Sequence, residues 1–189
     1  MLWRHLLKGW SSKQPSTPLH STSHRSILAL AFLVIRDAVK QRIWCRIRKD
    51  WVVDQPEEQV RQQLLNHLIE DLKFPESLVA IERKLSQMPH LPLDGTDYPD
   101  RRSDIVCFAN DIFPGHSLYP LLLIECKAVP MNSKTERQVI GYNHYLGSPF
   151  VCIANETERR IGWRNEEGYQ WQDGIPAYQT LLDVLSSAH

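Results

Sequence analysis

The sequence predicts a mixed α/β (α+β) domain in which helices flank a central sheet of four to five strands. Three observations predict this class. Apolar residues recur at helical spacing near position 60, short apolar runs bounded by turn residues follow, and the segments come in the order α-β-β-β-α-β. Hydrophobic residues make up 42% of the 189 residues, which is enough for one packed domain with an extension.

The first predicted helix begins at Pro56 and ends near residue 74. Asp54 or Gln55 can cap it, and Pro56 suits the first turn because its missing N–H is not needed there. Residues 57–58 are both Glu, which favours the positive end of the helix dipole. The apolar face comprises Val60, Leu64, Leu65, Leu68, Ile69 and Leu72.

Three predicted strands follow this helix. Residues 78–85 read LVAIERKL and residues 103–109 read SDIVCFA, with a long loop containing Pro and Gly, residues 86–102, between them. Residues 111–120 are predicted to form a second loop. Residues 121–128 read LLLIECKA, and because both faces of this third strand are apolar, it is expected at the centre of the sheet.

The remaining elements alternate between helix and strand. A helix is expected from about Thr135 to Leu146, with Gly147 placed to end it. The later predicted elements are a fourth strand at residues 150–154, a small hairpin of residues 160–163 and 169–172, and a short helix at residues 178–185.

Residues 1–42 are expected to form an N-terminal arm, separate from a domain that spans residues 43–189. Residues 1–26 are rich in Ser, Thr, His and Pro and contain no Asp or Glu, so they are expected to be poorly ordered. Residues 27–43 are expected to form a short apolar helix.

The charges are unevenly distributed although the net charge is zero. Residues 1–50 hold ten Lys and Arg against two Asp, a balance of +8, and residues 51–189 have the opposite balance of −8. This contrast suits an arm that touches phosphates beside a body that holds a cation. An unstructured leader would produce the same contrast.

Cysteine and apolar patterns indicate a cytoplasmic protein without a membrane span. Cys107, Cys126 and Cys152 lie inside apolar runs, where free thiols behave as small buried hydrophobes, and free thiols favour a reducing compartment. The longest apolar run, residues 27–35, is too short to cross a bilayer, which takes about 20 residues. No small-residue cleavage site follows it, which argues against an export signal. The sequence also lacks HExxH and G-x-S-x-G motifs.

Three ionisable residues lie at the ends of predicted core strands. Side chains alternate along a strand, so Glu125 and Lys127 should share one face while Cys126 points to the other. Asp104 opens a neighbouring strand and is followed by the apolar run IVCF. Two converging carboxylates suit Mg²⁺, which binds few protein oxygens and keeps several waters, and Mn²⁺ is expected to substitute for it. The ammonium of Lys127 can orient a water or stabilise charge on a phosphate. The same three residues also fit an ion-pair network that holds no metal.

Two residues on the later helix extend this cluster. Gln138 and Tyr142 lie four positions apart, hence on one face. They can hydrogen-bond a phosphate or support the metal ligands, although a tyrosine on a helix can also simply pack.

Further candidates flank the cluster in the sequence. Glu57, one turn before Arg61, can reach a metal or its water, or it can be an ordinary acid at a helix N-terminus; the sequence does not decide between Glu57 and Glu58. Arg101 and Arg102 precede Asp104 and can hold a phosphate, or they can form a solvated pair in a loop.

Five segments together resemble the N-terminal nuclease domain of type I restriction enzyme R subunits, and particularly small stand-alone proteins built from that domain. The segments are WVVDQPEEQVRQQLLNHLI, LVAIERKL, RRSDIVCF, LLLIECKA and QVIGYNHYLGSPFVCIAN. The resemblance covers residues 43–178 and implies a PD-(D/E)XK nuclease-like fold, Mg²⁺ dependence and hydrolysis of phosphodiester bonds in DNA. It implies that Asp104 and Glu125 are metal ligands and that Lys127 is the catalytic lysine. It also implies that Glu57 is the acid of the first helix and that Gln138 and Tyr142 form the family's Q-x-x-x-Y pair, so that Glu57 and Gln138 count among the catalytic residues and Tyr142 among those that bind DNA.

The sequence departs from that family in two places. It contains no GK dipeptide, so it has no G-x-x-x-x-G-K-[ST] loop and cannot be a complete restriction motor with its ATP-driven translocase. The segment between the second and third predicted strands, residues 111–120, is also longer than expected for the family.

Two functions remain in competition. The first is a metal-dependent DNA endonuclease, with DNA as its partner and restriction–modification or helicase subunits as candidate assembly partners; the sequence leaves the oligomeric state open, a dimer included. The second is a catalytically inactive DNA-binding or assembly module that retains the nuclease fold, because a fold does not guarantee its chemistry.

Overall fold

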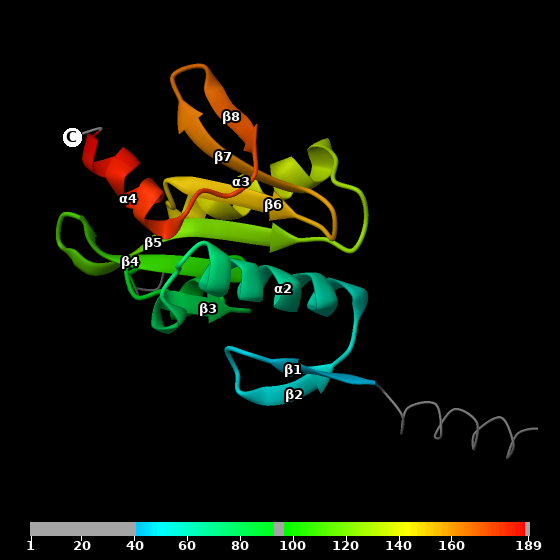
Figure 1. The fold of residues 1–189 in the computed structure, drawn as a ribbon. Helices are drawn as coiled ribbons and strands as arrows, with labels where there is room; N and C mark the ends of the chain where they lie inside the picture. The colour runs from blue at the N-terminus through cyan, green and yellow to red at the C-terminus, as the bar shows by residue number, and fades with distance from the viewer. Residues whose placement is uncertain (1–40, 93–96, 188–189) are drawn as a thin grey trace, which may run out of the picture. The chain divides into compact units, whose positions relative to one another are not determined.

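A mixed six-stranded sheet organises residues 41–92 and 97–187, the part of the chain that the computed structural model describes (Figure 1). Its strands, in spatial order, are β3 (Val79–Ile81), β4 (Ile105–Phe113), β5 (His116–Cys126), β6 (Phe150–Ala154), β7 (Arg159–Asn165) and β8 (Gly168–Asp173). The β5–β6 pair is parallel and the other neighbours are antiparallel. The mixed α/β class is confirmed, but the sheet has six strands rather than four to five, because both arms of the predicted hairpin join its edge.

The parallel β5–β6 pair requires a crossover, which α3 (Ser133–Leu146) supplies. Asn132 caps the helix with its side-chain oxygen, which accepts hydrogen bonds from the N–H groups of Lys134 and Thr135. Gly147 ends it in the left-handed conformation, with φ 73°. The predicted helix, its glycine stop and the strand at residues 150–154 are confirmed.

Residues 111–120 form no loop, and that prediction was wrong. Strands β4 and β5 continue through this segment as a long hairpin that turns at Pro114 and Gly115. Gly115 has φ 82°, which its missing side chain permits. Phe113 stacks on Tyr119 with ring centroids 4.5 Å apart, so aromatic packing across the hairpin outweighs the turn-forming composition of the segment.

Strand β3 is shorter than the predicted strand at residues 78–85. The ladder to β4 stops at Ile81, because Glu82 adopts φ 49° and leaves the strand conformation. Beyond it, irregular pairing continues: the N–H of Glu82 donates to the carbonyl oxygen of Asp104, the N–H of Ser103 donates to that of Arg83, and Lys84 forms an isolated bridge with Arg102. The segment after β3 therefore stays beside Asp104.

Helices cover both faces of the sheet (Figure 1). One core cluster joins α2 (Pro56–Asn66) and α4 (Tyr178–Ser187) to one face through residues such as Leu64, Leu122 and Leu181. The second cluster joins α3 to the other face through Val139, Leu123 and others. The first predicted helix is confirmed, with Gln55 as its N-cap and Pro56 as its first residue, and a π-helical turn (His67–Asp71) extends it. Short 3-10 turns occupy Glu76–Leu78 and Leu85–Gln87.

A small antiparallel hairpin precedes α2 and was not predicted. It consists of β1 (Arg42–Cys45) and β2 (Asp50–Val53). Trp44 and Trp51 pair across it with ring centroids 5.6 Å apart, yet both rings remain largely exposed, so the pattern of buried residues is weak. Arg42 and Ile43 therefore belong to a strand rather than to the predicted helix at residues 27–43. Residues 27–40 of that helix, like the rest of residues 1–40, lie outside the described residues.

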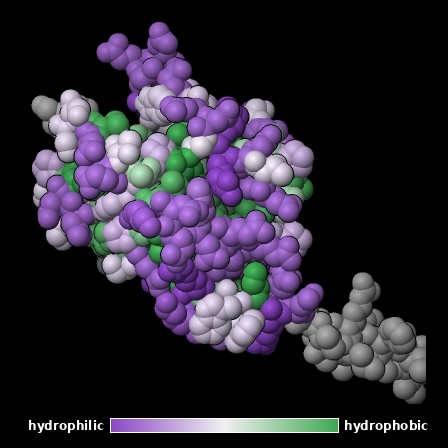
Figure 2. All heavy atoms as spheres, in the orientation of Figure 1, coloured by the Kyte–Doolittle hydropathy of each residue, from purple (hydrophilic) through white to green (hydrophobic). Residues whose placement is uncertain are grey.

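The face of the molecule that carries α2 is dominated by polar side chains (Figure 2). Figure 2 shows the α2 face as largely hydrophilic, with hydrophobic residues exposed in separate small patches. All four cysteines are free and buried, which confirms the expectation for Cys107, Cys126 and Cys152. In residues 41–92 and 97–187, no helix is long and apolar enough to span a membrane.

Candidate active site

Asp104, Glu125 and Lys127 meet at one end of the central strand pair. Ile105 at the start of β4 pairs with Ile124 near the end of β5, so Asp104 stands beside the end of β5. Its Oδ2 accepts a hydrogen bond from the backbone N–H of Cys126 at 2.8 Å. Lys127 Nζ lies 2.7 Å from Glu125 Oε1. The structure therefore brings together the three residues whose spacing predicted a cluster.

The faces of β5 explain why Glu125 and Lys127 cooperate. Cys126 is buried in the core cluster that contains α2, so the side chains on either side of it belong to the opposite face, which α3 covers. From α3, Gln138 donates a hydrogen bond from Nε2 to Glu125 Oε1. Gln138 thus holds the orientation of this carboxylate, a contact of the kind expected of a residue that supports a metal ligand.

The carboxyl group of Glu125 is unfavourably placed for a negative charge. Burial raises its pKa, repulsion from Asp104 raises it further, and the hydrogen bond from Lys127 only partly opposes them. Burial lowers the pKa of Lys127, but the hydrogen bond to Glu125 and the charges of Glu125, Glu57 and Asp104 raise it above the ordinary value. Lys127 is therefore a cation at neutral pH, within a locally negative site.

Arg61 is a site residue that the sequence did not predict to contact the cluster. Its buried guanidinium extends from α2 to Asp104, where Nη2 lies 3.0 Å from Oδ1. The same group contacts Glu82 Oε1 at 3.3 Å and also pairs with Glu58. The available signal was an arginine placed within the apolar stripe of α2, where an unpaired charge is costly.

The two glutamates at the start of α2 occupy different environments. Glu58 is buried, and its carboxylate accepts hydrogen bonds from Arg61 and Gln62. Glu57, the predicted site residue, is exposed, and its charge contributes to the raised pKa of Lys127. The acid joined to Asp104 through Arg61 is Glu58, whereas the acid whose charge acts on Lys127 is Glu57.

Tyr142 is buried and forms a hydrogen bond with the backbone. Its hydroxyl donates a hydrogen bond to the carbonyl oxygen of Arg83 at 3.1 Å, and burial raises its pKa. A tyrosine held in this way fixes the segment after β3, which agrees with the packing alternative rather than with direct contact to a phosphate.

The two arginines before Asp104 occupy different surroundings. Both are exposed. The charge of Arg101 lowers the pKa of Glu125, so this arginine lies on the side of the carboxylate cluster. Arg102 instead bridges to Lys84 and lines a separate cavity with it.

The donor atoms suit a small divalent cation bound by two carboxylates. Glu125 Oε2 makes no hydrogen bond within residues 41–92 and 97–187, and each Asp104 oxygen accepts one bond and keeps a lone pair. The same described residues contain no group of three or more His, Cys, Asp or Glu arranged around a common point. Mg²⁺ needs few protein ligands, and a cation here would relieve the repulsion between Asp104 and Glu125.

These observations define the class of protein: a mixed α/β domain whose two acidic residues and lysine converge at the end of adjacent sheet strands. The chain belongs to the family described as "Type I restriction enzyme R protein N terminus (HSDR_N)", whose family model matches residues 56–176. The match covers every candidate residue from Glu57 to Tyr142 and confirms the resemblance seen in the sequence. Comparison with curated proteins and with solved structures gave no match.

Proposed function

We propose that this protein is a metal-dependent DNA endonuclease of the PD-(D/E)XK type, which hydrolyses phosphodiester bonds. The observation that carries the proposal is the convergence of Asp104, Glu125 and Lys127 where β4 begins and β5 ends. Membership in the restriction-enzyme family supports a nuclease-like role for this cluster. Asp104 and Glu125 would hold Mg²⁺, and Mn²⁺ would substitute for it.

Each side chain has a separate part in hydrolysis. A bound Mg²⁺ supplies a Lewis acid that lowers the pKa of a water and offsets negative charge on the phosphate. In hydrolysis a water oxygen would attack phosphorus and release its proton to solvent, while the bond from phosphorus to the leaving sugar oxygen would break and solvent would protonate that oxygen. Lys127 has a raised pKa and stays protonated, so it acts as a fixed positive charge near the attacking water and the phosphate rather than as a general base.

The surrounding hydrogen bonds keep the two carboxylates in place before substrate arrives. Gln138 orients Glu125 from α3, while Arg61 and the N–H of Cys126 orient Asp104. A preorganised site of this kind spends no free energy on rearrangement during the reaction. Arg101, whose charge acts on Glu125, is suited to hold a phosphate of the substrate.

Residues 1–189 contain no GK dipeptide, so any ATP-driven translocation would come from outside these residues. Its candidate partners are DNA and the other components of a restriction–modification or helicase assembly.

A second candidate function is a DNA-binding or assembly module without catalysis. The observation that favours it is that the carboxylates already have partners within the protein. Arg61 forms an ion pair with Asp104, and Lys127 and Gln138 both contact one oxygen of Glu125. Such a network satisfies the buried charges without a metal.

Plasmid cleavage separates the two functions. Supercoiled DNA is incubated with Mg²⁺, with Mn²⁺ and with EDTA, using the wild type, Lys127→Ala, and Lys134→Ala as a matched control, since Lys134 is an exposed lysine of α3. We expect metal-dependent nicking by the wild type and the control, and a loss of about 10²–10³ in rate for Lys127→Ala. A wild type that binds DNA but never cleaves it with either metal would favour the inactive module.

A further inference from the structure

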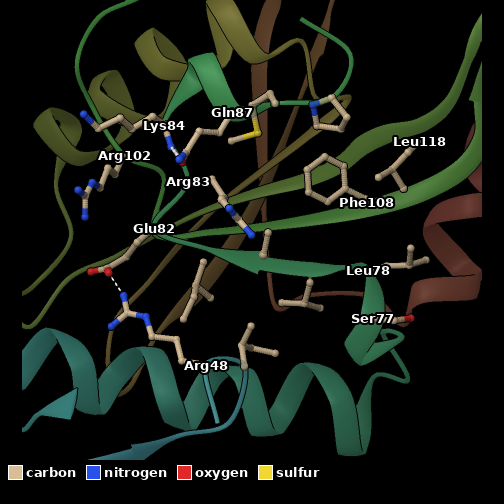
Figure 3. Close-up of a pocket in the computed structure, with 16 residues that line it drawn as sticks. Arg48, Ser77, Leu78, Glu82, Arg83, Lys84, Gln87, Arg102, Phe108 and Leu118 are labelled. Carbon is tan, nitrogen blue, oxygen red and sulfur yellow. Dashed lines mark hydrogen bonds and ion pairs between the residues drawn. The ribbon is translucent and has the colours of Figure 1, made fainter. Parts of the chain in front are cut away.

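A cavity of ≈ 700 Å³ borders β3, one of the two edge strands of the sheet (Figure 3). In the view of Figure 3, Phe108 and Leu118 lie toward one end of the cavity, and Lys84 and Arg102 lie toward the other. Arg48 enters from the turn between β1 and β2, and Arg83 from the segment after β3. This volume is within the range of about 300–1,000 Å³ that is common for ligand sites.

The cavity is positively charged although most of the chain is acidic. Four cations line it, Arg48, Arg83, Lys84 and Arg102, against the single carboxylate of Glu82, a balance of +3. Residues 51–189 as a whole have a balance of −8. A concave patch of the opposite sign concentrates anions near it. The charges that line the cavity therefore favour a negatively charged ligand over a positively charged one.

Two of the four cations are free to bind such a ligand. Arg48 pairs with Glu82, and Lys84 Nζ lies 2.6 Å from Asp100 Oδ1. Within the described part of the chain, Arg83 and Arg102 have no carboxylate oxygen within the 4.0 Å of an ion pair. Both are exposed guanidinium groups, whose planar donors match phosphate oxygens.

Hydrogen bonds join the backbone of the segment that carries Arg83 to residues of the candidate active site. The carbonyl oxygen of Arg83 accepts hydrogen bonds from the Tyr142 hydroxyl at 3.1 Å and from Ser103, whose N–H donates at 3.0 Å. The N–H of Glu82 donates to the carbonyl oxygen of Asp104 at 3.2 Å. A ligand held by Arg83 and Arg102 therefore lies against the segment that positions Asp104.

We propose that this cavity binds the phosphodiester backbone of the DNA on which the candidate active site acts, and that Arg83 and Arg102 are its main binding residues. The identity of the polyanion as DNA rests on the proposed function; the preference for a polyanion rests on the cavity alone. Arginines that bind phosphates fix the register of a strand without reading its bases, so binding here is independent of sequence.

The test measures binding without cleavage. A short fluorescein-labelled duplex is titrated in EDTA with the full-length wild type, Arg83→Glu, Arg102→Glu and the double variant, and fluorescence anisotropy is followed at several salt concentrations. The matched control is Arg164→Glu, which reverses the charge of another exposed arginine, in β7, that has no ion pair in the described residues. Thermal unfolding of each variant shows that it is folded.

We expect Kd to rise about tenfold or more in each cavity variant. The slope of the logarithm of the association constant against the logarithm of the salt concentration should become shallower by about 0.9 for each phosphate that the variant no longer neutralises. Arg164→Glu should bind as the wild type does. Wild-type affinity and slope in the double variant, or an equal weakening in Arg164→Glu, would overturn the proposal. Because EDTA prevents metal-dependent cleavage, a protein that binds through the cavity but never cuts with Mg²⁺ refutes the nuclease proposal and leaves this one standing.

Discussion

At the scale of single residues, Arg61 has the largest structural role among the charged side chains of the site. It is buried between Glu58, Glu82 and Asp104, so removing it leaves Glu58 and Asp104 without a counter-ion, whereas Glu82 keeps Arg48. Breaking a fully buried pair costs about 3–5 kcal/mol, and we expect Arg61→Gln to lose about 3 kcal/mol because Glu82 and Asp104 are partly exposed. Urea unfolding measures this loss.

The control for Arg61 is Arg46→Gln. Arg46 also joins two glutamates, Glu70 and Glu76, but it does so at the surface. Exposed ion pairs are screened by water, so the loss of stability should be much smaller. Equal losses in the two variants would show that burial of Arg61 does not decide its contribution.

Lys127 and Glu125 should separate metal binding from catalysis. We expect Lys127→Ala to bind Ca²⁺ or Mn²⁺ at least as well as the wild type, because removing a nearby cation leaves the two carboxylates more negative. Glu125→Gln removes one of two proposed ligands and should impair binding, and both variants should lose cleavage. Isothermal titration calorimetry with each metal checks the binding. A Lys127→Ala protein that nicks plasmid at the wild-type rate would remove this lysine from the mechanism.

Glu125 should titrate above the ordinary glutamate pKa of 4.5 in the metal-free protein, since burial and Asp104 both disfavour its charge. The folded protein then holds this proton more tightly than the unfolded chain does. The resulting stability is fully present below 4.5 and is lost as the pH rises through the raised pKa. Carbon-detected NMR of the carboxyl group measures the titration, and Asp104→Asn should move the midpoint back toward 4.5. A midpoint at or below 4.5 in the wild type would contradict the expectation.

At the scale of secondary structure, the β7–β8 pair depends on a glycine. Gly162 faces Trp171 across the two strands, and a Cβ added at Gly162 would stand 2.8 Å from Cε3 of that ring. We expect Gly162→Ala to destabilise the protein by about 1–3 kcal/mol through overpacking, with a change in tryptophan fluorescence. Urea unfolding followed by fluorescence measures both effects.

Gly141 provides a control of opposite sign. It lies within α3, and an added Cβ would meet no atom within 4 Å. Gly141→Ala should therefore stabilise the helix, by up to about 1 kcal/mol. If Gly162→Ala proved as harmless as Gly141→Ala, then Trp171 would move aside without cost.

Local signals in the sequence predicted some elements far better than others. The helix ending at Gly147 and the strand at residues 150–154 carry a glycine stop and an unbroken apolar run, and both were predicted closely. The hairpin of β1 and β2 was missed because its tryptophans remain exposed, which hides the alternation. The extension of β4 and β5 through residues 111–120 was missed because Pro and Gly near position 114 predict a loop. Stacking between Phe113 and Tyr119 instead continues both strands up to the turn.

At the scale of the whole molecule, the sequence could predict the strand residues of the site but not their helical partners. Period-2 alternation fixed the common face of Glu125 and Lys127, and an apolar run after Asp104 fixed its place at a strand end. The hydrogen bond between Arg61 and Asp104 spans 43 positions and depends on how α2 packs over the sheet. No local sequence pattern encodes that packing, so the roles of Arg61 and Glu58 could be recognised only from the folded structure.

The last prediction concerns how much of the chain the domain requires. A truncated chain beginning at Gln41 should unfold cooperatively with nearly the stability of the full chain, because the carbonyl oxygen of Gln41 accepts a hydrogen bond from the N–H of Asp54 at 2.7 Å and closes the β1–β2 hairpin. A chain beginning at Asp50 should be clearly less stable, since it also lacks buried Cys45 and the hydrogen bond from the N–H of Arg46 to Gln62.

The same truncation tests the basic arm. Residues 1–40 hold six Lys and Arg against one Asp, so the Gln41 chain keeps a balance of −5. If the arm touches phosphates, duplex DNA binding by the Gln41 chain should be weaker than for the full chain, with a shallower dependence on salt. An unchanged slope would assign DNA binding to the folded domain and leave the arm without a role in it. A Gln41 chain that melts without cooperativity would instead show that residues 1–40 are structural.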